Sequence, residues 1–376
     1  MLAALSAVLA VASCKAAPEK TPFLTAGEQH ILPGVRTMEL GCELAISGIP
    51  ERAKQLRAWV PFPVAGRYQR VIEPTVESPS SYRPVIHYDA QYDTPMMYLS
   101  ADGPPLPSEL KLVYSVRVER GMVEPNELKA GPMEPDNVLQ RLFATDLALG
   151  SGPSRDELVK IAEGIAPPDN SPMARARRIY DYVLNTVEID NSATFSPPTP
   201  AADNATAAPA PATEGPMTTP GAPADNATLS RAAQYALNVL TFHKAAPVDY
   251  ATATAMLMRA AGIPAHVESG LLLGEDKTPD RAAASESAAW VRFYVNGMGW
   301  SACDPYLAKR YPELRERMFA GLSANRVQMS AGPEPALVPA PQSGLPILFF
   351  APIVEADGKP VFASMRLTFR DVPGGK

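Results

Sequence analysis

Apolar positions are densest from Asp249 to Pro264 (DYATATAMLMRAAGIP), where they cover most of the circumference of a helix. The residues at helical spacing are Tyr250, Ala253, Leu257 and Ala261. A helix that is apolar on so many sides is buried. Asp249 can cap its start, Gly262 can end it, and Pro264 returns the chain to an extended conformation. We therefore predict a buried central helix over this stretch.

A different pattern runs from Val35 to Arg120, where apolar and polar residues alternate in short runs. The first run alternates at Met38, Leu40, Cys42, Leu44 and Ile46, and similar runs cover residues 56–60 and 112–118. Proline, glycine and serine separate these runs. Several short alternating runs divided by turn residues are typical of an antiparallel β-sandwich, which we place at residues 35–122.

Helical spacing begins after this region. We predict helices over residues 138–149, 156–165, 229–240 and 311–320, and another that starts at Ser171-Pro172 with a capping hydroxyl and a first-turn proline. After the central helix, residues 288–295 and 299–304 alternate as strands around the turn Asn296-Gly297. A last hairpin is predicted to pair residues 347–355 with 361–369.

These patterns divide the chain into parts. We expect a signal segment at 1–14, a spacer at 15–34, the sandwich at 35–122, a linker at 123–137, an α+β domain at 138–345 and a C-terminal hairpin at 346–372. Within the α+β domain, residues 194–228 are nearly all Pro, Ala, Thr, Asn, Asp and Gly. Such a composition has little to bury, so we predict that this insert is disordered.

Composition and charge narrow the possible functions. The 376 residues are 46% hydrophobic and 20% charged, which is typical of a globular protein long enough for two domains. The net charge is -6, with no basic cluster. This argues against nucleic acid or an anionic membrane surface as the main partner.

The first fourteen residues form an apolar run without charge that ends in LAVASC, at Cys14. This run resembles a bacterial lipoprotein signal, although the usual positive charges before it are missing. The resemblance implies a lipid at Cys14 and a place in the bacterial cell envelope, facing the periplasm or the exterior. An ordinary secretory signal and a buried strand are the alternatives. Apart from the lipidated Cys14, the processed chain contains Cys42 and Cys303, and we expect two buried, unpaired thiols.

Four blocks carry a resemblance to a known family. They are the run RIYDYV from Arg178, the central helix with RAAGIPA from Arg259, the strand with Ala289-Trp290, and Gly299-Trp300 followed by Asp304-Pro305. In order and spacing they resemble the bacterial transglutaminase-like family. The resemblance implies an α+β, papain-like core in which a buried helix packs on an antiparallel sheet. The runs RAWVPFP from Arg57 and Tyr68-Gln69 look like the β-sandwich that often precedes this core.

The chemistry of this family needs a cysteine at the amino end of the central helix, a histidine on a following strand and an aspartate on the next one. The resemblance places these groups at Pro247, Ala288 and Asp304. Only the aspartate is present. We therefore predict a degenerate, non-catalytic domain that binds a polypeptide or an envelope protein, without a cofactor or metal. The possible cleft residues are His243, Tyr250, Trp290 and Trp300.

Two alternatives belong to other classes. An active thiol peptidase or acyltransferase could use Cys303, with His243 or His266 as its base. Against it, Asp304 next to Cys303 raises the pKa of a thiol, and strand alternation directs the two side chains to opposite faces. For both histidines we expect a solvated or hydrogen-bonded side chain. The second alternative is an assembly subunit that presents its sandwich to partners.

Overall fold

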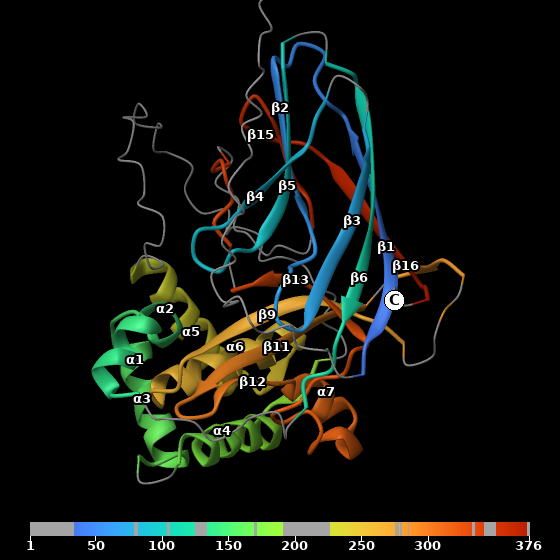
Figure 1. Cartoon of the computed structure of the whole chain (residues 1–376). Coiled ribbons are helices and arrows are strands. Elements are labelled where there is room, and N and C mark those ends of the chain that lie inside the picture. The colour runs from blue at the N-terminus through green and yellow to red at the C-terminus, as the bar shows by residue number, and fades with distance from the viewer. Residues whose placement is uncertain are drawn as a thin grey trace, which may run out of the picture. The chain divides into compact units, whose positions relative to one another are not determined.

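The computed structural model of the chain (Figure 1) describes residues 34–78, 82–103, 106–124, 134–168, 171–190, 226–274, 278, 280–284, 286–332, 335–341 and 351–373. The predicted signal segment with Cys14, nearly all of the spacer and the predicted insert up to residue 225 lie outside these residues. The described residues all belong to one compact unit. In the described part of the chain, no helix is both long and apolar enough to cross a membrane.

The predicted sandwich is present as two antiparallel sheets of five strands each. One sheet has the order β10-β16-β1-β6-β3 and the other β15-β14-β2-β5-β4. The strands of the sandwich within residues 35–122 are β1 (Arg36–Ser47), β2 (Gln55–Pro61), β3 (Gln69–Glu77), β4 (Val85–Tyr88), β5 (Pro95–Asp102) and β6 (Glu109–Arg120). The three predicted runs, at 38–46, 56–60 and 112–118, fall on β1, β2 and β6. The alternating apolar residues of β1 are buried in the core between the sheets, as their spacing predicts.

The rest of the sandwich comes from distant parts of the chain. These strands are β10 (Ala282–Ala283), β14 (Ile353–Ala356), β15 (Lys359–Pro360) and β16 (Ala363–Asp371). The separate C-terminal hairpin predicted at 346–372 is therefore wrong. Only the short tip between β14 and β15 is a hairpin, while β16 crosses to the other sheet and pairs with β1 along nine residues from Met38 to Ile46. A long pairing with β1 and burial of Phe369 in the core outweigh a local hairpin.

Outside the sandwich lies a separate four-stranded antiparallel sheet with the strand order β12-β11-β9-β13. We call it the second sheet. Its strands are β9 (Ala265–Leu272), β11 (Glu286–Val295), β12 (Gly299–Cys303) and β13 (Arg326–Ala331). The predicted turn at Asn296-Gly297 joins β11 to β12, and Gly297 has a φ of 80°, which favours glycine. Gly270 on β9 faces β13 so closely that a Cβ would lie 1.8 Å from the carbonyl oxygen of Val327.

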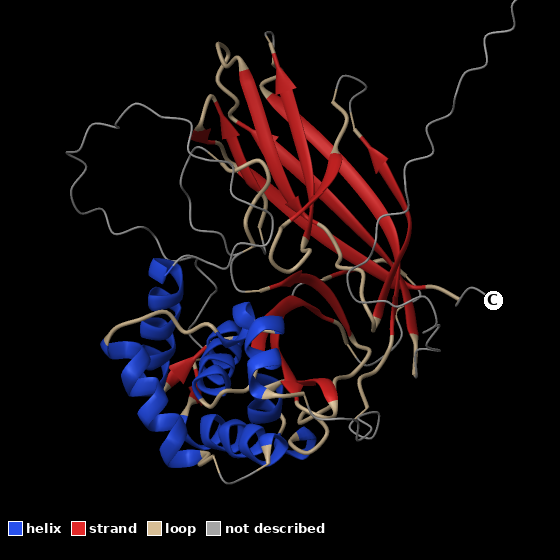
Figure 2. Cartoon of the chain, turned by 60° about the vertical axis from the view of Figure 1, so that its left-hand side comes forward, coloured by secondary structure: helices blue, strands red, loops and turns tan. Residues whose placement is uncertain are grey.

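Helices gather beside this second sheet, whereas the sandwich has none among the described residues (Figure 2). They are α1 (Asp136–Leu142), α2 (Ala144–Leu147), α3 (Pro153–Ile165), α4 (Pro172–Thr186), α5 (Asn226–Phe242), α6 (Pro247–Ala260) and α7 (Pro305–Arg310). The short strands β7 (Glu188–Ile189) and β8 (Lys244–Ala245) pair in parallel. The helix predicted over 311–320 is wrong. Asp304 and Pro305 start α7 earlier, and Pro312 begins a short 3₁₀ turn, Pro312–Leu314.

The predicted central helix is α6, and its residues from Tyr250 to Arg259 are all buried. It packs on β9 and β11 and against the helices α3, α4 and α5. Its end follows from Gly262, whose φ of 73° lets the N–H of Ile263 return to the carbonyl of Met258 at 2.8 Å. The sequence therefore predicts both this helix and its stop correctly.

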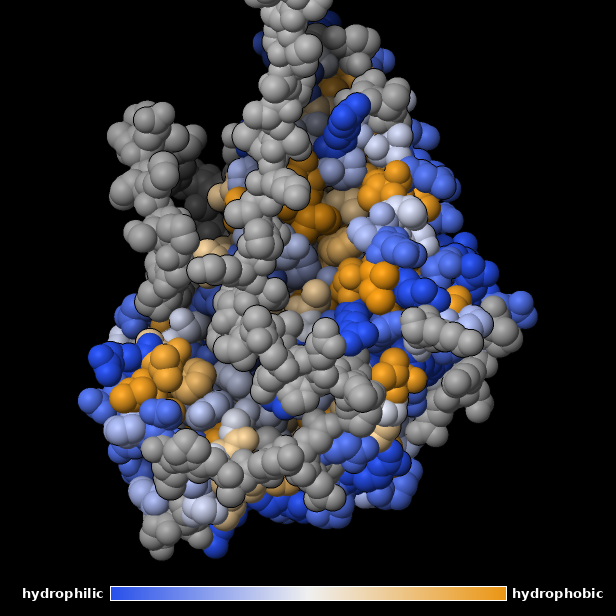
Figure 3. Space-filling view, viewed as in Figure 1, coloured by the Kyte–Doolittle hydropathy of each residue, from blue (hydrophilic) through white to orange (hydrophobic). Residues whose placement is uncertain are grey.

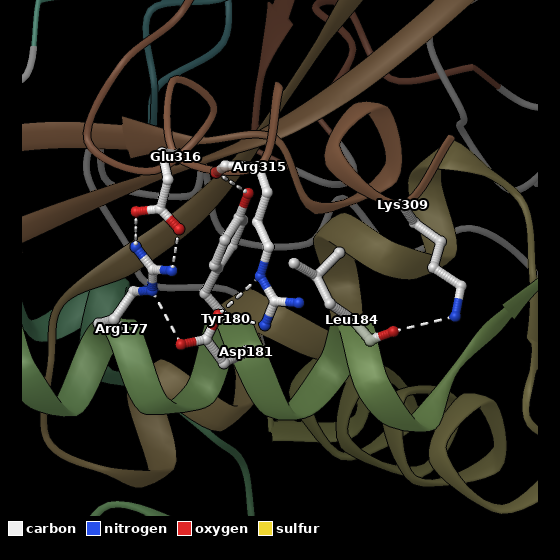
Figure 4. A network of polar contacts seen from close by, with 7 residues as sticks. All are labelled: Arg177, Tyr180, Asp181, Leu184, Lys309, Arg315 and Glu316. Carbon is white, nitrogen blue, oxygen red and sulfur yellow. Dashed lines mark hydrogen bonds and ion pairs between the residues drawn. The ribbon is translucent and has the colours of Figure 1, made fainter. Parts of the chain in front are cut away.

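A polar network holds α4 to the segment after α7 (Figure 4). Arg177 binds Glu316 through two nitrogens, at 2.6 and 2.7 Å, and Asp181 at 2.8 Å. Arg315 reaches the same Asp181 at 2.6 Å, and the hydroxyl of Tyr180 donates to the carbonyl of Arg315. Glu316 is largely exposed, so this network positions the elements more than it stabilises them.

The sandwich is joined to the second sheet through the side chain of Gln69. This buried amide accepts a hydrogen bond from the N–H of Gln328 on β13 and donates to its carbonyl, each at 2.8 Å. Leu271, Val327 and Met329 of the second sheet also belong to the core of the sandwich. The backbone N–H and carbonyl of Gln328, at the edge strand β13, thus find hydrogen-bond partners in the sandwich. Apolar residues do reach the surface elsewhere: Figure 3 shows them over α1, which ends at Leu142, 64% exposed.

Candidate functional site

The position that the family resemblance assigns to a cysteine is the first residue of α6. Pro247 is half-buried there, and its ring suits the first turn of a helix because the N–H that it lacks has no partner in the helix. Asp249 closes the turn: one carboxylate oxygen accepts from the N–H of Ala246 at 2.8 Å, and the other from the hydroxyl of Tyr235. The helix start is therefore capped by a carboxylate.

The position that the family resemblance assigns to a histidine, Ala288, lies on the opposite side of the sheet from α6. Ala289 and Val291 pack in the same core as α6. Because strand residues alternate, Ala288 and Trp290 point the other way, into a separate apolar cluster. That cluster consists of Tyr68, Val123, Ala288, Trp290, Ala302 and Leu322.

Asp304, the one group of the three that remains, is 2% exposed and already fully engaged. One oxygen accepts from the N–H of Leu307 at 2.8 Å and caps α7, and the other accepts from Nη1 of Arg326 at 3.1 Å. Burial raises the pKa of Asp304, although Arg326 and the Leu307 N–H favour its charged form. The aspartate therefore pairs with a guanidinium and positions a helix.

Sequence reasoning missed Arg326. It lies on β13, is completely buried, and has its guanidinium 4.8 Å from the centre of the Trp290 ring. Arg326 is one of three polar residues that alternate with apolar ones in the sequence RVQMSA of β13, and its partner lies 22 residues away. That pattern does not say which carboxylate the arginine would meet.

The geometry opposes the thiol alternative. Cys303 is buried on the α6 side of β12, and burial together with the charge of Asp304 raises the pKa of its thiol well above the usual value. Cys42 is also buried, and both cysteines are free, as predicted. His243 is exposed at the end of α5, with Nδ1 3.1 Å from the carbonyl of Thr186. His266 lies on the other face of the sheet, so neither predicted base accompanies Cys303.

The predicted cleft residues fall into two separate groups. His243 and Tyr250 belong to the region around the start of α6, where the Tyr250 hydroxyl donates to the carbonyl of Val187 at 2.7 Å. Trp290 and Trp300 lie on the other face of the sheet. Trp290 is buried and donates to Glu268 at 2.5 Å, while the Trp300 ring lies 5.1 Å from that of His266. The four residues therefore do not line one cleft.

Comparison with known proteins agrees with this fold. Residues 221–305 match the model of the transglutaminase-like superfamily, and this range contains all three positions Pro247, Ala288 and Asp304. The chain carries a transglutaminase-like domain. Among curated proteins, none matches the sequence.

Among solved structures, one with a TM-score above 0.5 resembles the chain in fold. A candidate cysteine protease from Cytophaga hutchinsonii has 12% identity and a TM-score of 0.52, with 91% of this chain and 92% of that chain covered. The periplasmic domain of TgpA from Pseudomonas aeruginosa has 17% identity and a TM-score of 0.34, with 73% of this chain and 79% of that chain covered. The first likeness spans both the sandwich and the transglutaminase-like domain.

The transglutaminase-like domain also holds a buried polar network around His266 that the sequence did not reveal. Nδ1 of His266 is 2.8 Å from Asp146 on α2, and Nε2 is 3.8 Å from Glu268. Burial lowers the pKa of His266, but Asp146 and Glu268 outweigh it and leave the pKa raised. The described residues contain no group of three His, Cys, Asp or Glu that could hold a metal ion.

Proposed function

We propose that this transglutaminase-like domain is non-catalytic and acts by binding a polypeptide partner at the bacterial cell envelope. The observation that carries the proposal is the state of the three catalytic positions. Proline and alanine replace the nucleophile and the base, and the remaining Asp304 is bound to Arg326 and to a helix N-terminus. Loss of a nucleophile and its base costs many orders of magnitude in rate, which an orienting acid cannot restore.

The replacements preserve the scaffold while removing the reaction. Proline fits the first turn of α6, and Ala288 packs into an apolar cluster. Around the start of α6, the surface offers apolar and polar groups to a partner: Phe242 is 74% exposed, and His243 and Lys244 are exposed beside it. The envelope location and a lipid anchor at Cys14 are proposed from the apolar run that ends at that residue.

A thiol-labelling experiment tests the absence of catalysis. The native full chain is treated with an alkylating probe, and labelled residues are identified by mass spectrometry. We expect no labelling of Cys303 in the folded protein and full labelling after denaturation, because the thiol is buried and its pKa is raised. Stoichiometric labelling of Cys303 in the native protein, lost in Cys303→Ala, would contradict the proposal and favour an active thiol enzyme. Cys42→Ala is the matched control for the other buried thiol.

Site-specific cross-linking tests the binding role. A photoreactive phenylalanine analogue replaces Phe242 at the end of α5 or, as a control, Val76 in the exposed part of β3. We expect a discrete cross-link to one polypeptide from position 242 in cells that make the full chain, and none from position 76. Equal cross-linking from both positions would contradict a partner at the start of α6, and cross-linking from position 76 alone would favour an assembly role for the sandwich.

A further inference from the structure

Buried guanidinium groups converge on Trp290, on the face of the second sheet away from α6. Arg326 of β13 places its Cζ 4.8 Å from the centre of the indole ring, and Arg120 at the end of β6 places its Cζ 5.8 Å from it. Arg326 is 0% and Arg120 2% exposed. A third guanidinium, of Arg292, lies over the ring of Tyr68 beside them. The sandwich and the transglutaminase-like domain thus both contribute to this arginine cluster.

Several donors of the arginine cluster have no acceptor. Nη1 of Arg326 donates to Asp304, but its Nε and Nη2 and the Nε of Arg120 are buried without a hydrogen-bond partner among the described residues. A buried donor without a partner costs about 1–3 kcal/mol, more when it is charged. Three such nitrogens on two neighbouring guanidinium groups are therefore a feature that needs an explanation.

The cluster also has more positive than negative charge. Two carboxylates, Glu268 and Asp304, face the three guanidinium groups. The carboxylate of Glu268 has several partners: it accepts from the indole N–H of Trp290, and its Oε1 lies 3.6 Å from Nε of Arg292 and 3.8 Å from Nε2 of His266. The positive charge of a protonated His266 is balanced by Asp146. Burial lowers the pKa of Arg120 to about 9. Glu268 opposes this change, while the charges of Arg326 and Arg292 add to it.

A water molecule would serve these donors less well than an anion. The side chains packed around Trp290 include the apolar residues Val123, Ala288, Ala302 and Leu322 together with Tyr68, and the two carboxylates nearby already accept from Trp290, Arg326 and the Leu307 N–H. A water there would accept from two guanidinium N–H groups, but its own hydrogens would need acceptors and the positive charge would remain. A small anion accepts from every N–H and also neutralises the charge.

We propose that Arg120 and Arg326 hold a small monovalent inorganic anion of the size and charge of chloride beside Trp290. The anion accepts from the Nε of both arginines and from Nη2 of Arg326, and it links β6 of the sandwich to β13 of the second sheet. A larger, peptide-borne carboxylate does not suit the cluster, because both arginines are almost completely buried. This site is independent of the proposed binding role.

Diffraction locates the anion directly. Crystals of the full chain are grown or soaked in sodium bromide, and data are collected at the bromine absorption edge. We expect an anomalous peak within hydrogen-bonding distance of Nε of both Arg120 and Arg326. Bromide peaks only elsewhere on the molecule, or a water at this position that bromide does not replace, would overturn the proposal.

Solution measurements give the affinity. The Tm of the full chain is followed as chloride replaces gluconate at constant ionic strength, since a ligand that binds only the folded state raises stability with its concentration. We expect the Tm to rise with chloride, and Arg120→Met to weaken the apparent chloride affinity at least 10-fold. The matched control is Arg70→Met, an exposed arginine of β3, which should keep the full chloride response.

An equal chloride response in Arg120→Met and in the unchanged chain would contradict the site. If Arg120→Met does not fold, the bromide experiment on the unchanged chain decides by itself. Neither outcome depends on whether the domain binds a polypeptide, so the two proposals fail separately.

Discussion

The two faces of the β12-β11-β9-β13 sheet are built on opposite principles. Toward α6 the sheet presents small and apolar side chains such as Ala289, Val291 and Phe293, and the helix covers them completely. On the other face the same strands carry Glu268, Trp290 and Arg292 in a buried network of charge. Stable packing on the apolar face requires side chains of complementary shape, whereas stable packing on the charged face requires an oppositely charged partner for each buried charge.

This difference places the three positions that the family resemblance assigns to catalysis in different surroundings. Pro247 starts α6, which packs on the apolar face, whereas Ala288 lies on the other face. Asp304 pairs with Arg326, whose guanidinium belongs to the charged face. Each of the following experiments tests whether the two faces really differ in what stabilises them.

The largest effect is expected on the charged face, from Arg326→Leu. It leaves the carboxylate of Asp304 buried without its partner, which should lower the free energy of unfolding by about 3–5 kcal/mol. Adding Asp304→Asn should recover part of this loss, because an amide still accepts from the Leu307 N–H but carries no charge. Urea unfolding of the two variants and of Asp304→Asn gives the double-mutant cycle. Strict additivity would show that the pair is not coupled.

On the apolar face, Leu257→Ala should cost about 3 kcal/mol, since it leaves a cavity in the middle of the buried helix. The matched control is the same substitution at Leu142, which is exposed on α1 and should cost less than about 0.5 kcal/mol. Thermal and urea unfolding measure both. Similar losses at the two leucines would contradict the burial of α6.

The charged face should also make stability depend on pH. Asp146 and Glu268 outweigh burial and raise the pKa of His266 above that of the unfolded chain, near 6.5. The folded state therefore holds a proton that the unfolded state releases, and this contribution is present below about pH 6.5 and lost as the pH rises through the folded pKa. Tyr92 and Arg259 also face this network.

Urea midpoints between about pH 6 and about pH 9 should fall for the unchanged chain and fall less for His266→Gln, because the glutamine does not titrate. A substitution on the apolar face, Leu257→Ala, is the control: it should shift the whole curve without changing its slope. Parallel curves for all three proteins would remove His266 from the explanation.

The smallest effect is expected away from both faces, in the exposed network between α4 and the segment after α7. Arg177→Met breaks contacts with Glu316 and Asp181, but the partners are solvated, so the loss should be at most about 1 kcal/mol and should shrink in high salt. Glu316→Gln should have a smaller effect still. A loss as large as that of Arg326→Leu would show that exposure alone does not separate the two kinds of ion pair.

The same contrast explains what the sequence could predict. The helix α6, its stop at Gly262 and the turn at Asn296-Gly297 were confirmed, because hydrophobic spacing and glycine conformation are local properties. The absence of a cysteine at 247 and of a histidine at 288 is also readable from the sequence. Arg120 and Arg326, by contrast, come together at Trp290 only in the folded chain, although they are about two hundred residues apart in the sequence. The periodicity of hydrophobic residues does not predict such a long-range contact.

The pairing of β1 with β16 has a consequence for how the chain folds. Among the described strands, β1 comes first along the chain and lies between β6 and β16, which comes last of them, so one of its edges stays open until residues 363–371 can pair with it. The transglutaminase-like domain, whose elements lie between β6 and β14, can complete its core earlier. During that interval the open edge of β1 can pair with another chain, so this pairing protects the strand from aggregation.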